Sequence, residues 1–95
     1  MIQLDPQGRI VLPPFCVQCF DNPTQSLVFL YHENDLYELC NANSIEIYSM
    51  KLCSSTVIQN KKHRITIPRA IRQGYSDFVI LYSKDNRVFI QFHKV

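Results

Sequence analysis

The sequence predicts a mainly β fold: a small closed barrel of two β-β-α-β-β units, with short helices plugging its ends. The first observation is a basic motif that occurs twice, with Arg9 and Arg64 at equivalent positions 55 residues apart. The second is a pair of apolar runs after each motif, joined by a short polar turn. One such unit cannot bury both faces of its strands alone. Two copies related by a pseudo-twofold axis are therefore expected to share one core.

Turn and helix signals divide the first copy, residues 2–40, into its elements. Gly8 suits a turn that requires positive φ, whereas Pro13 and Pro14 end a strand and begin a short helix. The predicted elements are strands over Ile2–Asp5 and Arg9–Leu12, a helix to about Phe20, a loop over Asp21–Thr24, and a hairpin of Leu27–Tyr31 with Leu36–Cys40 around His32–Asp35.

The second copy, residues 57–93, repeats this order. His63 stands where Gly8 stands in the first copy, and histidine tolerates positive φ better than β-branched residues do. Pro68 fits the first position of a helix, and Gly74 fits its C-terminal end. The predicted elements are strands over Val57–Asn60 and Arg64–Ile67, a helix over Pro68–Gln73, and a hairpin of Phe78–Tyr82 with Arg87–His93 on an Asp85-Asn86 turn.

The connector between the copies, residues 41–56, has two interpretations. Ile45, Ile47 and Tyr48 alternate as in a strand, whereas Ile45, Tyr48 and Leu52 also share one face of a helix. The pattern leaves it as a partly ordered connector.

Length and composition indicate one domain over residues 1–95 with a single core. No apolar run approaches the roughly 20 residues of a membrane span. The N-terminus lacks the charged start and apolar stretch of a signal peptide. We therefore expect a cytoplasmic protein with reduced cysteines.

The charge distribution is lopsided although the net charge is only +2. Residues 1–55 carry two cations and six anions, whereas residues 56–95 carry eight cations and two anions. A fold of two structural copies does not explain this difference. Binding of a polyanion by the second half does, and random drift of surface charge is the alternative.

The cations are densest around the second motif, in the stretch NKKHRITIPRAIR. Lysine supplies point charges to phosphates, and arginine can bond bidentately to phosphate or guanine. The candidate DNA-binding residues are Lys61, Lys62, His63, Arg64, Arg69 and Arg72, with Arg9 from the first motif. The alternatives are a solvated hairpin tip at residues 61–64 and a structural ion pair of Arg9 with Asp5.

The two motifs resemble a known signature. Asp5-x-x-Gly8-Arg9-Ile10-x-Leu12-Pro13 is similar to that of the AbrB/SpoVT/MazE/MraZ group of transcription factors, and Asn60-x-x-His63-Arg64-Ile65-x-Ile67-Pro68 is a degenerate second copy. Two copies in one chain most resemble the MraZ branch. The resemblance implies a swapped-hairpin β-barrel, double-stranded DNA as partner, nucleoid association, and DNA contact by the motif residues Arg9 and Arg64. MraZ-like proteins form rings, so a homo-oligomer is one implication, although one chain with both copies could complete a barrel alone.

The cysteines and histidines give weaker signals. Cys16 and Cys19 form a C-x-x-C that could join Cys40 and Cys53 in a zinc site or act as a redox pair. The second pair lacks a tight spacing, which favours buried thiols on the first helix, without zinc or disulfide. No catalytic grouping and no cofactor motif is evident. The sequence thus favours a DNA-binding transcriptional regulator without catalysis; the alternative is an antitoxin-like or scaffold module that binds protein and not DNA.

Overall fold

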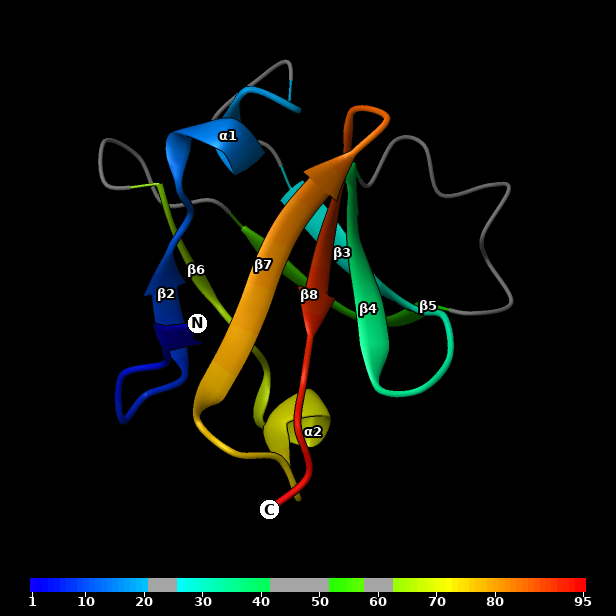
Figure 1. The fold of residues 1–95 in the computed structure, drawn as a ribbon. Helices are drawn as coiled ribbons and strands as arrows, with labels where there is room; N and C mark the ends of the chain where they lie inside the picture. Colours follow the sequence, from blue (N-terminus) through cyan, green and yellow to red (C-terminus); the bar gives the residue numbers. More distant parts are fainter. Residues whose placement is uncertain (21–25, 42–51, 58–62) are drawn as a thin grey trace.

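The computed structural model describes residues 1–20, 26–41, 52–57 and 63–95, and for residues 26 and 52–57 the main chain only. Within these ranges the fold is mainly β with antiparallel sheets, which confirms the predicted class (Figure 1). The same order of elements occurs in both halves. The elements are β1 (Ile2–Gln3), β2 (Arg9–Val11), α1 (Pro14–Val17), β3 (Ser26–Tyr31) and β4 (Leu36–Asn41), then β5 (Leu52–Val57), β6 (Arg64–Thr66), α2 (Arg69–Arg72), β7 (Phe78–Lys84) and β8 (Arg87–Gln91).

Both helices are shorter than predicted. Pro68 is the N-cap of α2 and not its first residue, and Pro13 is likewise the N-cap of α1. After α1 the main chain tightens, because the N–H groups of Cys19 and Phe20 donate to carbonyls three residues back. After α2, Gln73 is extended and Gly74 has a φ of 88°, which ends the helix.

The connector prediction needs one correction. β5 begins at Leu52, inside the predicted connector and five residues before the predicted strand Val57–Asn60. The reason lies in the pairing, because β5 follows β3 through the whole run from Ser26 to Leu30. Residues 42–51, 58–60 and the predicted loop 21–24 lie outside the described residues.

Strands of the two halves are interleaved in the larger sheet. Its order is β1-β7-β8-β4-β3-β5, so β1 of the first half pairs with β7 of the second, and β5 of the second pairs with β3 of the first. The two remaining strands, β2 and β6, pair with each other in a separate two-stranded sheet, called here the β2–β6 ribbon. Neither half could form either sheet alone.

The register of the ribbon follows an approximate twofold relation between the copies. Ile10 lies opposite its own equivalent, Ile65. Two further main-chain bonds exchange the same way: Leu12 N–H donates to the His63 carbonyl at 2.9 Å, and Ile67 N–H donates to the Gly8 carbonyl at 2.8 Å. Exchanging the copies converts each bond into the other.

The turns at Gly8 and His63 have the expected left-handed conformations, and so do both residues of the predicted Asp85-Asn86 turn. Gly8 has a φ of 80°, and His63 at the equivalent position has a φ of 48°. The β7–β8 hairpin turns at Asp85 and Asn86, with φ values of 54° and 60°. Two successive positive φ values in a two-residue loop match the type I′ turn that suits the twist of a hairpin.

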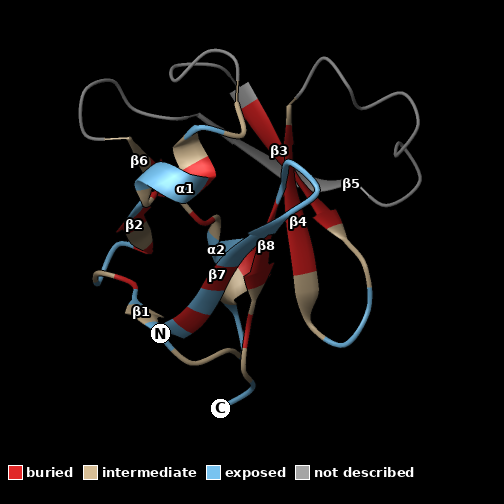
Figure 2. Ribbon diagram, turned by 45° about the horizontal axis from the view of Figure 1, so that its top comes forward, coloured by how far each residue is buried: buried red, intermediate tan, exposed pale blue. Residues whose placement is uncertain are grey.

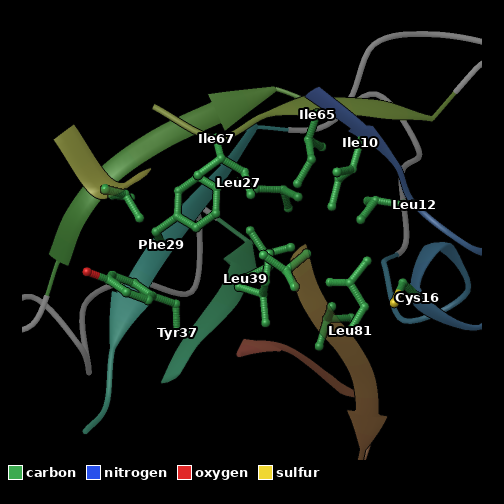
Figure 3. Packing of buried hydrophobic residues seen from close by; sticks show 14 of the residues in the cluster. Ile10, Leu12, Cys16, Leu27, Phe29, Tyr37, Leu39, Ile65, Ile67 and Leu81 are labelled. Atoms are coloured by element: carbon green, nitrogen blue, oxygen red, sulfur yellow. The ribbon is translucent and has the colours of Figure 1, made fainter. Parts of the chain in front are cut away.

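The core lies between the ribbon and the larger sheet. Side chains alternate along each strand, so Ile10 and Ile65 point inward, at 4% and 0% exposure. Figure 3 shows these two residues facing the core beside Leu12, and Figure 2 shows buried residues running along β3, β4 and β8. On its other face, the sheet carries a smaller buried cluster of Val28, Leu30 and Cys40.

Candidate nucleic-acid interface

The outward face of the β2–β6 ribbon carries both motif arginines. Since Ile10 and Ile65 point inward, the alternate residues Arg9, Arg64 and their partners face away from the core. Arg9 lies opposite Thr66, and Arg64 lies opposite Val11. The two arginines are therefore diagonal neighbours, roughly 7–8 Å apart at the backbone.

Asp5 holds Arg9 in place. The Arg9 Nε–H donates to Asp5 Oδ2 at 2.6 Å, while the main-chain N–H groups of Gln7 and Arg9 donate to Asp5 Oδ1 at 2.9 and 2.8 Å. The hydrogen bond from the Arg9 main chain is the main reason that the pKa of Asp5 lies below its ordinary value. The structural ion pair considered from the sequence is thus present. It engages the Nε edge of a guanidinium that is still one-third exposed.

Arg64 differs from Arg9 in its surroundings. The residue equivalent to Asp5 is Asn60, outside the described residues, and among the described ones Arg64 has neither an ion pair nor a hydrogen bond to its side chain. Arg9, Val11 and Arg64 line one open cleft of about 510 Å³ between the ribbon and the β1–β2 turn. The cleft brings together two predicted site residues that are 55 positions apart in sequence.

The helix arginines occupy another site. Arg69 and Arg72 line a pocket of about 370 Å³ together with Tyr75 and Ser76. α2 follows the C-terminal end of β6, whereas His63 precedes its N-terminal end (Figure 1). Arg72 Nε–H donates to the Ile67 carbonyl at 2.8 Å, and its guanidinium fills the space that a side chain at residue 8 would need. Arg72 of the second copy therefore packs against the turn of the first, while its hydrogen bond stays within the second copy.

The cationic turn is only partly described. Lys61 and Lys62 lie outside the described residues, and His63 is half-buried with its carbonyl bonded to Leu12. The sequence suggests one basic tip over residues 61–72. The described cations instead divide between the ribbon face and the α2 pocket.

Sequence reasoning missed a buried polar cluster on the outer face of the larger sheet. Glu38 on β4 is 4% exposed and accepts two hydrogen bonds from Arg87, at 2.6 and 2.9 Å, while His32 Nε2 lies 2.9 Å from it. Burial raises the pKa of Glu38, but the hydrogen bonds from Arg87 and His32 outweigh this effect and leave the pKa below its ordinary value. A single acid within the apolar run Leu36–Cys40 was the available signal.

This cluster also changes the meaning of the charge asymmetry. Glu38 of the acidic first half neutralises Arg87 of the basic second half. Asp35 of the first half likewise accepts a hydrogen bond of 2.7 Å from the Tyr75 hydroxyl. One acid of the first half and one base of the second half thus form a structural ion pair between the halves, whereas the Tyr75 hydroxyl that bonds Asp35 is uncharged.

The cysteines take different environments. Cys16 on α1 is fully buried in the core, which raises the pKa of its thiol to about 11, as expected for a buried thiol on the first helix. Cys19 lies beyond the end of α1, where its thiol donates to the Phe15 carbonyl at 3.4 Å. Among the described residues Cys16, Cys19 and Cys40 are free, and no group of three ligands suited to a metal occurs; the Cys53 side chain is outside the described part of the chain.

No helix in the described part of the chain is long and apolar enough to cross a membrane. A comparison with known proteins finds no matching protein-family model, no matching curated protein and no matching solved structure.

Proposed function

We propose that the chain is a non-enzymatic, DNA-binding transcriptional regulator of the AbrB/MraZ swapped-hairpin type, which contacts double-stranded DNA through the outer face of the β2–β6 ribbon. The observation that carries the proposal is the register of the ribbon, which sets Arg9 and Arg64 as diagonal neighbours on one exposed face. A pair of arginines related by an approximate twofold suits a duplex, whose two strands are related in the same way.

The pairing of strands between the copies supports the swapped-hairpin barrel. β1 leaves its own copy to pair with β7, and β5 does the same with β3. The ribbon then joins the two copies on the remaining side. This exchange is the arrangement that two copies of a swapped-hairpin unit would adopt.

The dimensions of the ribbon fit a major groove. A two-stranded ribbon can enter the groove, which is about 12 Å wide. The run from Gly8 to Leu12 spans roughly 13 Å at about 3.3 Å per residue. The two ends of the ribbon would then approach phosphates on both sides of the groove. Lys61 and Lys62, which precede His63 in the sequence, would supply phosphate contacts, and Arg69 beyond the other end would supply another.

Anisotropy of a labelled random-sequence duplex, titrated over a series of salt concentrations, tests the proposal. We expect Arg64→Ala to weaken binding and to flatten the dependence of log affinity on log salt by about one unit. Lys84→Ala is the matched control, because it removes an exposed cation from the β7–β8 hairpin and leaves the ribbon intact. Equal effects of the two substitutions would refute a specific role for the ribbon.

One observation favours the rival function, a protein-binding module. β7 exposes three large apolar side chains on one face of the sheet: Phe78, Ile80 and Tyr82. If the wild type binds no duplex even at low salt, the DNA proposal fails. That face then becomes the leading candidate for a protein contact.

A further inference from the structure

The outer face of the β2–β6 ribbon has a second component beside its arginines. Arg9 faces Thr66 across the ribbon, and Val11 faces Arg64. These four residues form a square array in which the arginines occupy one diagonal and two methyl-bearing side chains, Val11 and Thr66, occupy the other. Val11 is 55% exposed, although valine ordinarily gains stability by burial. Both β-branched side chains have restricted rotamers and therefore present their methyl groups in fixed directions.

We propose that Val11 and Thr66 read thymine methyl groups in the same short site in which Arg9 and Arg64 read guanines, so that the ribbon selects an approximately twofold site of guanine and thymine. This inference rests on the proposed DNA-binding function and adds its sequence preference. Guanine offers the O6 and N7 acceptors that suit arginine, and thymine is the base with a methyl group in the major groove.

The spacing of the array matches that of stacked bases. Arg9 and Val11 are two residues apart on one strand, which separates them by roughly 6.7 Å. Two base-pair steps span about the same length, at roughly 3.4 Å each. Each strand of the ribbon therefore presents one arginine and one methyl-bearing side chain to bases two steps apart.

The two halves of the site are expected to differ in strictness. Asp5 holds the Nε edge of Arg9 at 2.6 Å. Because the side chain is already ordered, Arg9 loses less conformational entropy when its outer edge binds a base. Arg64 has no such described acid, since Asn60 replaces it in the second motif. The bases contacted by Arg9 should therefore be selected more strictly. Binding at the bases contacted by Arg64 should depend more strongly on salt concentration.

The test begins with selection of duplexes from a random pool by the wild-type protein. Each thymine of the selected site is then replaced by deoxyuridine, which removes only the methyl group, and each guanine by 7-deazaguanine, which removes the N7 acceptor. We expect at least one deoxyuridine to weaken wild-type binding about fourfold, the equivalent of one lost buried methyl group. If Val11 reads that thymine, the same deoxyuridine should not change the affinity of Val11→Ala. If Thr66 reads it, the same deoxyuridine should not change the affinity of Thr66→Ser.

Controls separate this inference from the proposed function. Thr66→Val keeps the methyl group and should keep the effect of deoxyuridine, and Ile80→Ala removes an exposed β-branched side chain from another part of the surface. The salt dependence should be the same for Val11→Ala and the wild type, because no charge is lost. Duplex binding without sequence enrichment, or an equal effect of deoxyuridine on Val11→Ala, Thr66→Ser and the wild type, overturns the inference and leaves the DNA proposal standing. Absence of any duplex binding overturns both.

Discussion

Gly8→Ala tests the packing of Arg72, in the second copy, against Gly8 in the first. The φ of Gly8 is 80°, a left-handed conformation that costs an L-residue about 1–2 kcal/mol. A Cβ added there would also meet the Arg72 guanidinium. Arg72 must then move and lose its hydrogen bond to the Ile67 carbonyl, which costs roughly 1.5–3 kcal/mol for a bond from a charged group. The expected loss in the free energy of unfolding is about 2.5–5 kcal/mol, a large fraction of the stability of a small domain.

Gly74→Ala is a matched control for this prediction. Gly74 has a similar φ of 88°, but a Cβ added there would meet no atom within 4 Å. It should cost only the backbone strain, about 1–2 kcal/mol. Urea denaturation of both variants measures the difference, and Arg72→Ala combined with Gly8→Ala should cost less than the two single losses added together. Equal losses for the two glycines, with additive effects of Gly8 and Arg72, would refute the contact as the source of the stability.

The remaining predictions concern three other parts of the molecule. Arg87→Ala should lower the free energy of unfolding by about 2–4 kcal/mol, because it leaves Glu38 buried with fewer partners, whereas Lys84→Ala should change it by less than about 0.5 kcal/mol. Because the pKa of Glu38 is lowered in the folded state, the ionised Glu38 stabilises the fold above the ordinary pKa of 4.5, and this stabilisation is lost as the pH falls through the folded-state pKa. Urea denaturation at a series of pH values from 7 to 3 should show this loss of stability in the wild type and a smaller loss in Arg87→Ala. In DNA titrations Arg9→Ala should weaken binding less than Arg64→Ala but relax base preference more, and equal losses with equal salt slopes would indicate two equivalent contacts instead. Thiol labelling followed by mass spectrometry should modify Cys19 before Cys16 and Cys40, because burial raises the pKa of the latter two thiols to about 11 and about 12, and elemental analysis should find no stoichiometric zinc.

Much of the local structure is predictable from the sequence, because its signals are short-range. Glycine, proline and the Asp-Asn pair locate the turns, and apolar alternation locates the strands to within a few residues except β5, which begins five residues before the predicted strand. The repeat also transfers information between copies: it predicts that His63 adopts the positive φ of Gly8, and it does. The sequence places the start of α2 one residue too early, because a proline at the N-cap and one at the first helical position look alike in sequence. It extends α1 too far at its C-terminal end, where the N–H groups of Cys19 and Phe20 donate to carbonyls three residues back.

Part of the candidate site is predictable for the same reason. The motif by itself singles out Arg9 and Arg64, but it leaves two roles open for Arg9. Proximity along the chain also groups Arg64 with Arg69 and Arg72. In the folded protein β6 carries the chain away from Arg64 before α2 begins, so Arg64 shares its cleft with Arg9 instead.

The sequence by itself determined the β character, the turns and the duplicated motif, because these follow from the steric preferences and hydrophobic period of residues close together in the chain. Only the tertiary structure decided which strands pair. That choice set Ile10 against Ile65, placed two arginines on one face and drew Glu38 to Arg87 from 49 residues away. Such contacts depend on how two apolar surfaces bury each other while every strand finds hydrogen-bonding partners, and no local pattern encodes that outcome.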